Sequence, residues 1–172
     1  MSLERLKKYI QRLALTSKVL YIITLIILLC ETISFLWLSL MPNKLTSFFN
    51  VFRIWAPFVT NLDNTALSRY ELATGIVQHV FLFLIFLTLR ETFLKLEPNL
   101  NFSDIARQLK KLSLIFIAES LILPVFKTVS CNVYLGNAVP LETVDMCPVI
   151  IGALLYFFSI FALSKSVEVK ED

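Results

Sequence analysis

Three ionisable side chains, Glu31, His79 and Glu119, each lie near the middle of a separate apolar run. A charged group at the centre of a bilayer is costly, so such residues usually face other protein and often belong to a proton, ion or ligand site. Two carboxylates and an imidazole suit Zn, Fe or Mn, and they also suit a proton relay. The sequence therefore predicts an intramembrane polar cluster of Glu31, Gln78, His79 and Glu119.

The spacing of these residues favours a simpler alternative to a metal site. No two of the candidate ligands are three or four positions apart, although most metal sites in helix bundles contain such a pair. Each polar group would then hold one pair of helices together by a hydrogen bond, worth about 0.6–2 kcal/mol. We predict no metal and no cofactor, and the proton relay stays open.

Four apolar runs must position these residues, at about 19–41, 73–89, 112–126 and 148–164. A helix that crosses the hydrocarbon core needs roughly 17–25 residues, and the third run gains length from the helical lead-in at Ile105 and Leu109. The hydrophobic content of 57% exceeds the roughly 45–50% of soluble domains. We therefore predict an all-α polytopic membrane protein with four transmembrane helices, in a single domain that covers residues 1–172.

The Lys and Arg residues are divided unequally between the two sides that four spans define. The larger group is Arg5, Lys7, Lys8, Arg12, Lys18, Arg90, Lys95, Arg107, Lys110, Lys111, Lys165 and Lys170; the smaller group is Lys44, Arg53, Arg69 and Lys127. Cytoplasmic loops carry the excess of Lys and Arg. The distribution predicts that both termini are cytoplasmic.

Two segments outside the spans are predicted to lie on the membrane surface. Residues 2–18 have apolar side chains on one face and basic side chains elsewhere, which suits an interfacial helix; a plain extension of the first spanning helix is the alternative. Residues 45–56 are rich in Phe and Trp and end before Pro57, so a short helix on the outer leaflet is expected, with a lipid-anchored loop as the alternative.

Cys131 and Cys147 both fall in the predicted outer connection at 127–147. Disulfides form in oxidising compartments, and a loop of this size would gain about 3 kcal/mol from a bridge. We predict a Cys131–Cys147 disulfide, with two free thiols as the alternative. Cys30, inside the first span, is expected to be a small packing residue.

The sequence contains no motif of a known enzyme class. A Gly-rich phosphate loop, an H-E-x-x-H pair and a Ser nucleophile elbow are all absent from it. The net charge of +3 is small and scattered, whereas a nucleic-acid-binding protein would carry a basic stripe. We therefore expect a protein that is not an enzyme and does not bind nucleic acid directly.

Several short segments resemble a bacterial family of four-helix membrane proteins of unknown function, whose members are often encoded beside a small helix-turn-helix regulator. These segments are Leu89–Phe93, Asn101–Ala106, Arg107–Leu112, Ile151–Phe158 and the acidic tail Glu168–Asp172. The resemblance covers most of the chain in layout and residues 89–112 at the level of motifs. It implies an inner-membrane protein that partners or sequesters a cytoplasmic regulator.

These observations lead to three functional hypotheses. The first is a non-enzymatic regulatory protein that binds a cytoplasmic partner, or lipid, through the basic residues Arg107, Lys110 and Lys111. The second is an immunity-type protein against a membrane-active extracytoplasmic toxin, suggested by the aromatic segment 45–56. The third is a small transporter or channel that uses the polar cluster. Oligomeric state, including a homo-oligomer, is left open because four helices alone form only a narrow pore.

Overall fold

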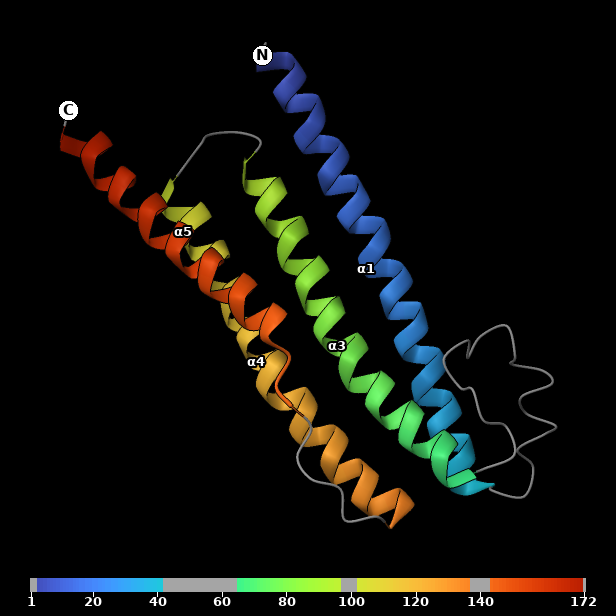
Figure 1. Ribbon diagram of the computed structural model, residues 1–172. Coiled ribbons are helices and arrows are strands. Elements are labelled where there is room, and N and C mark those ends of the chain that lie inside the picture. The colour runs from blue at the N-terminus through green and yellow to red at the C-terminus, as the bar shows by residue number, and fades with distance from the viewer. Residues whose placement is uncertain (1–2, 42–64, 97–101, 137–142, 172) are drawn as a thin grey trace. The chain divides into compact units, whose positions relative to one another are not determined.

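The computed structural model describes residues 3–41, 65–96, 102–136 and 143–171. These residues form four long helices, shown in Figure 1: α1 (Leu3–Leu40), α3 (Thr65–Leu96), α4 (Phe102–Leu135) and α5 (Met146–Glu171). Each of the four is long and apolar enough to cross a membrane. The all-helical class and the four spanning helices predicted from the sequence agree with the described structure.

The helices are longer than the apolar runs that predict them. With a rise of 1.5 Å per residue, the 38 residues of α1 extend over about 57 Å, whereas a hydrocarbon core is about 30 Å thick. Residues 3–40 contain neither Pro nor Gly, so nothing interrupts the helix. The described residues of the segment 2–18 are the first turns of α1, which agrees with the alternative of a plain extension of the first spanning helix.

Helix α4, which corresponds to the third predicted span, also continues beyond the predicted end of that span at residue 126. Pro124 lies inside α4, and the helix ends only at Leu135, where Gly136 has a positive φ of 66°. Left-handed glycine is a common helix terminator because it has no Cβ to strain the backbone. The segment 45–56, predicted to form a surface helix, lies outside the described residues.

The predicted disulfide is not formed in the structure, where both Cys131 and Cys147 are free thiols. The prediction assumed that both cysteines belong to a flexible outer connection. Cys131 instead lies inside α4, and Cys147 lies in the first turn of α5. A bridge requires the two Cα atoms to be about 4.4–6.8 Å apart, and two helical residues have less freedom than loop residues to reach that distance.

Polar residues dominate the buried positions of the described helices, and large apolar residues dominate their surface. Fifteen polar or charged residues are buried, against nine hydrophobic ones. Soluble proteins show the opposite pattern, with Leu, Ile, Val and Phe inside. Lipid tails are as apolar as these side chains, so helix interfaces in membranes use small and hydroxyl-bearing residues instead. The burial pattern therefore supports the membrane character that helix length and composition indicate.

The contacts of the chain group into two compact units. Unit 1 comprises Met1–Ile22, Phe81–Ser120 and Asp145–Asp172, and unit 2 comprises Ile23–Val80 and Leu121–Val144. All twelve cations predicted for the cytoplasmic side fall within the sequence ranges of unit 1, and the other four fall within those of unit 2. The division of the basic residues along the sequence thus coincides with a division of the fold.

Within unit 1, α4 and α5 pack in an antiparallel arrangement. A Cβ built on Gly152 would be 2.8 Å from Ile117 Cγ1 and 3.1 Å from the Ser113 carbonyl oxygen, and Lys110 Nζ is 6.0 Å from the ring centroid of Tyr156. If the predicted spans 112–126 and 148–164 were centred at the same depth in the membrane, Tyr156 would lie opposite Glu119. The register is therefore displaced by nine residues, or about 13 Å, toward the basic end of α4.

Candidate intramembrane site

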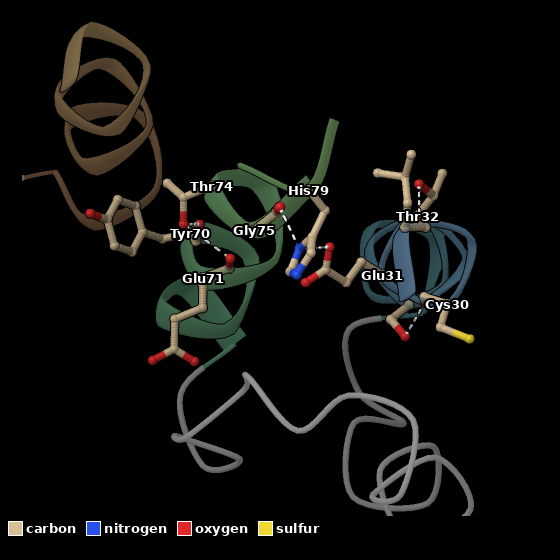
Figure 2. Close-up of polar contacts among 10 residues, drawn as sticks. Cys30, Glu31, Thr32, Tyr70, Glu71, Thr74, Gly75 and His79 are labelled. Carbon is tan, nitrogen blue, oxygen red and sulfur yellow. Dashed lines mark hydrogen bonds and ion pairs between the residues drawn. The ribbon is translucent and has the colours of Figure 1, made fainter. Parts of the chain in front are cut away.

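Unit 2 brings Glu31 of α1 and His79 of α3 into direct contact. His79 Nδ1 is 2.9 Å from Glu31 Oε2, and Figure 2 shows the two side chains pointing toward each other from their helices. The Glu31 side chain is 1% exposed. A burial this complete requires a compensating partner for an acid, and His79 supplies it.

The position of Gly75 decides how the imidazole is oriented. His79 Nδ1 is also 2.9 Å from the Gly75 carbonyl oxygen, one helical turn earlier in α3. This bond has the better alignment, because neither carboxyl oxygen of Glu31 has an aligned hydrogen-bond partner among the described residues. The contact between Glu31 and His79 is therefore mainly electrostatic in this geometry.

The pair has zero net charge in either of two protonation states. One state joins an imidazolium to a carboxylate, and the other joins a neutral imidazole to a protonated Glu31. In both states the same ring nitrogen, Nδ1, lies 2.9 Å from the Glu31 carboxyl group and 2.9 Å from the Gly75 carbonyl oxygen. Because neither state leaves a net charge in the apolar interior, the pair can be buried at a much lower cost than either ion alone.

Gly75 also provides the space in which the Glu31 carboxyl group lies. A Cβ at position 75 would be only 2.7 Å from Glu31 Oε1 and 3.3 Å from the carboxyl carbon. Any other residue at this position would push the carboxyl group away from its present place. Close approach of two helices at a glycine is common in membrane proteins, and here it lets an acid lie against the backbone of the next helix.

The neighbouring hydroxyl groups do not take part in the pair. Ser34 Oγ donates to the Cys30 carbonyl at 2.7 Å, and Thr74 Oγ1 is within 2.9 Å and 3.0 Å of the Tyr70 and Glu71 carbonyl oxygens. Such bonds satisfy a hydroxyl within its own helix. The carboxyl group of Glu71 points away from the pair in Figure 2, so Glu31 and His79 have no acidic neighbour from that turn.

A cation fixes α1 and α3 together farther along the same unit. Arg69 Nη2 donates to the carbonyl oxygen of Leu38 at 3.0 Å. Leu38 lies in the last turn of α1, where the helix dipole favours a positive charge. This contact and the Glu31–His79 contact, seven residues apart on α1, set the antiparallel register of the two helices in unit 2.

Within unit 2, Gln78 does not join the pair. Gln78 is exposed, whereas its neighbour His79 is buried. Glu119 belongs to unit 1. Within the described part of the chain, no group of three or more His, Cys, Asp or Glu side chains is arranged to hold a metal ion.

Gly75 and Arg69 were not singled out by the sequence analysis. Gly75 has a weak signal, because it is one of only three glycines in the chain and precedes His79 by one helical turn. Arg69 entered the sequence analysis only as one of the basic residues whose distribution predicts the orientation of the chain in the membrane. No pattern in the sequence predicts that its side chain would bind a carbonyl oxygen at the end of another helix.

The basic residues predicted to meet a partner or lipid lie near the start of α4, in unit 1. Arg107, Lys110 and Lys111 are all exposed. Arg107 and Lys110 line a cavity that α4 forms with α5, and Lys111 is not among the residues that line it. Lys110 faces the Tyr156 ring, so it is partly ordered by a cation–π contact.

Comparison of the chain with protein-family models, curated proteins and solved structures finds no match.

Proposed function

We propose that the chain is a non-enzymatic protein of the bacterial inner membrane that binds a cytoplasmic partner, with both of its termini on the cytoplasmic side. The orientation follows the excess of Lys and Arg, and the basic residues of unit 1 would then lie at the cytoplasmic face. The resemblance to a family encoded beside small regulators suggests a regulator as the partner.

One observation carries the partner-binding proposal. The displaced register of α4 and α5 places the second half of the apolar α5 run level with the basic start of α4. Phe157, Phe158 and Phe161 are 65%, 54% and 56% exposed there, close in depth to Arg107, Lys110 and Lys111. Arg107, Lys110 and Lys111 are exposed at this end of α4, so the matching partner would present acidic side chains.

The proposal predicts that a cytoplasmic protein is recovered with the detergent-solubilised chain after crosslinking. Changing Arg107, Lys110 and Lys111 together to Glu should reduce that recovery about tenfold or more, because like charges placed against an acidic surface repel it. Quantitative mass spectrometry of the recovered protein measures the effect.

The matched control changes Lys7, Lys8 and Arg12 of α1 to Glu, which alters the net charge by the same amount. This variant should keep most of the recovery. Equal losses in the two variants, or no partner with the unaltered protein, would reject the proposed surface.

The Glu31–His79 contact favours a second candidate function, a small proton-coupled transporter or channel. An acid and an imidazole in contact inside an apolar helix pair are the kinds of group that form proton relays in membranes. The test is proton flux into proteoliposomes. Glu31→Gln should abolish most of the flux, and Ser34→Ala, a buried change one turn away at a hydroxyl bonded to its own helix, should retain it. Flux no higher than in protein-free vesicles would exclude this candidate.

The toxin-immunity hypothesis depends on residues 45–56, which lie outside the described residues. It remains a proposal from the sequence alone, and survival of toxin challenge after deletion of the gene would decide against it.

A further inference from the structure

A cavity of about 350 Å³ opens between the start of α4 and the second half of α5, within unit 1. Its lining combines two cations, two serines and a tyrosine with apolar side chains. The lining residues are Ser103, Ala106, Arg107, Lys110, Tyr156, Ser159, Ile160 and Leu163. The Glu31–His79 pair uses none of them, whereas Arg107 and Lys110 also belong to the proposed partner surface.

The α4 wall of the cavity is suited to an anion. Arg107 and Lys110 are three residues apart, so they lie on the same face of the helix. Neither is paired with a carboxylate within the described part of the chain. Lys110 Nζ is held 6.0 Å from the Tyr156 ring centroid, a contact that leaves its hydrogen-bond donors available. Arg and Lys side chains of this kind bind phosphate groups through charge-assisted hydrogen bonds.

The α5 wall is suited to a hydrocarbon chain. Ile160 and Leu163 line the cavity, and both side chains are more than half exposed, at 54% and 52%. Ser159 donates its hydroxyl to the Tyr156 carbonyl at 2.6 Å, so it adds little polarity of its own. An apolar strip therefore leads directly away from the cationic wall.

The depth of the cavity matches that of a lipid headgroup. Arg107 and Lys110 lie five and two residues before Leu112, at which the apolar run of α4 begins. Basic pockets between membrane helices on the cytoplasmic side recognise the headgroups of anionic lipids. A water-soluble anion would use the cations and leave the apolar strip uncovered, whereas a phospholipid uses both walls.

We propose that this cavity binds an anionic phospholipid, with Arg107 and Lys110 on its phosphate and with Ile160 and Leu163 against its acyl chain. The site shares Arg107 and Lys110 with the proposed partner surface, but lipid binding there requires no second protein. Lipid bound here would cover the gap between α4 and α5 and stabilise their displaced register.

Native mass spectrometry of the delipidated, detergent-solubilised full chain tests the site. Added phosphatidylglycerol should remain bound, whereas phosphatidylcholine with the same acyl chains should not. Arg107→Gln combined with Lys110→Gln should weaken the binding of phosphatidylglycerol about tenfold, because hydrogen bonds to charged groups contribute more than neutral ones. The charge-preserving pair Arg107→Lys and Lys110→Arg should retain most of the binding and shows that changes at these positions do not prevent folding.

The control combines Lys95→Gln with Lys111→Gln, two exposed cations outside the cavity. Equal weakening in the control would show a general attraction of basic residues for anionic lipid and would overturn the site. Displacement of the lipid by inorganic phosphate at millimolar concentration would show a simple anion site and would overturn the lipid assignment. Because only purified protein and defined lipid are present, failure to find a protein partner would leave this result unaffected.

Discussion

His79→Ala is expected to lower the free energy of unfolding of the detergent-solubilised protein by about 3–5 kcal/mol, the usual cost of removing one partner from a buried ion pair. The substitution leaves Glu31, which is 1% exposed, without the imidazole 2.9 Å away. The carboxyl group must then be buried as an uncompensated charge, take up a proton or move, and each of these costs free energy. Unfolding by sodium dodecyl sulfate in mixed micelles, followed by circular dichroism, measures the loss.

The double variant Glu31→Gln/His79→Ala distinguishes charge balance from simple packing. It removes the acid as well as its partner, so it should be more stable than His79→Ala alone, although less stable than the unaltered protein. A double-mutant cycle isolates this coupling when the two side chains are in contact. Additive losses from the two single changes would show that Glu31 and His79 do not depend on each other.

Gly152→Val is expected to separate α4 from α5 and to destabilise the protein by about 1–3 kcal/mol, the typical cost of overpacking a tight interface. Even a Cβ at this buried position would be 2.8 Å from Ile117 Cγ1 and 3.1 Å from the Ser113 carbonyl oxygen. Ile117 can adopt another rotamer, but a backbone oxygen inside a helix cannot move alone. The helices must therefore shift apart, and the cavity at Arg107 and Lys110 should lose its affinity for anionic lipid.

Ala153→Val is the matched control for this prediction. It adds two methyl groups at the next position, which is exposed, and it should change stability by no more than about 0.5 kcal/mol, as for most surface substitutions. The same detergent titration and native mass spectrometry apply to both variants. A Gly152→Val protein with the stability and lipid binding of the control would contradict the close approach of α4 and α5.

The sequence alone was sufficient for the architecture and for part of the candidate site. Uninterrupted apolar runs predict four spanning helices because a backbone in lipid must satisfy its own hydrogen bonds. Glu31 and His79 stood out for the related reason that an ionisable group in such a run requires a partner. The limits of the helices were less predictable, because helical residues continue through the basic segments on either side of the apolar ones.

Only the tertiary structure decided which of these polar residues meet and how the helices are aligned. Glu31 pairs with His79 at the gap left by Gly75, while Gln78 is exposed beside them. The basic start of α4 meets the middle of α5, which creates the cavity between Arg107 and Ile160. Hydropathy could not determine either feature, because lipid and helix neighbours are equally apolar and a uniformly apolar run does not specify which face is buried. The buried face of each helix and the alignment of neighbouring helices follow instead from the close approaches at Gly75 and Gly152. These approaches depend on how the side chains of neighbouring helices fit together in three dimensions.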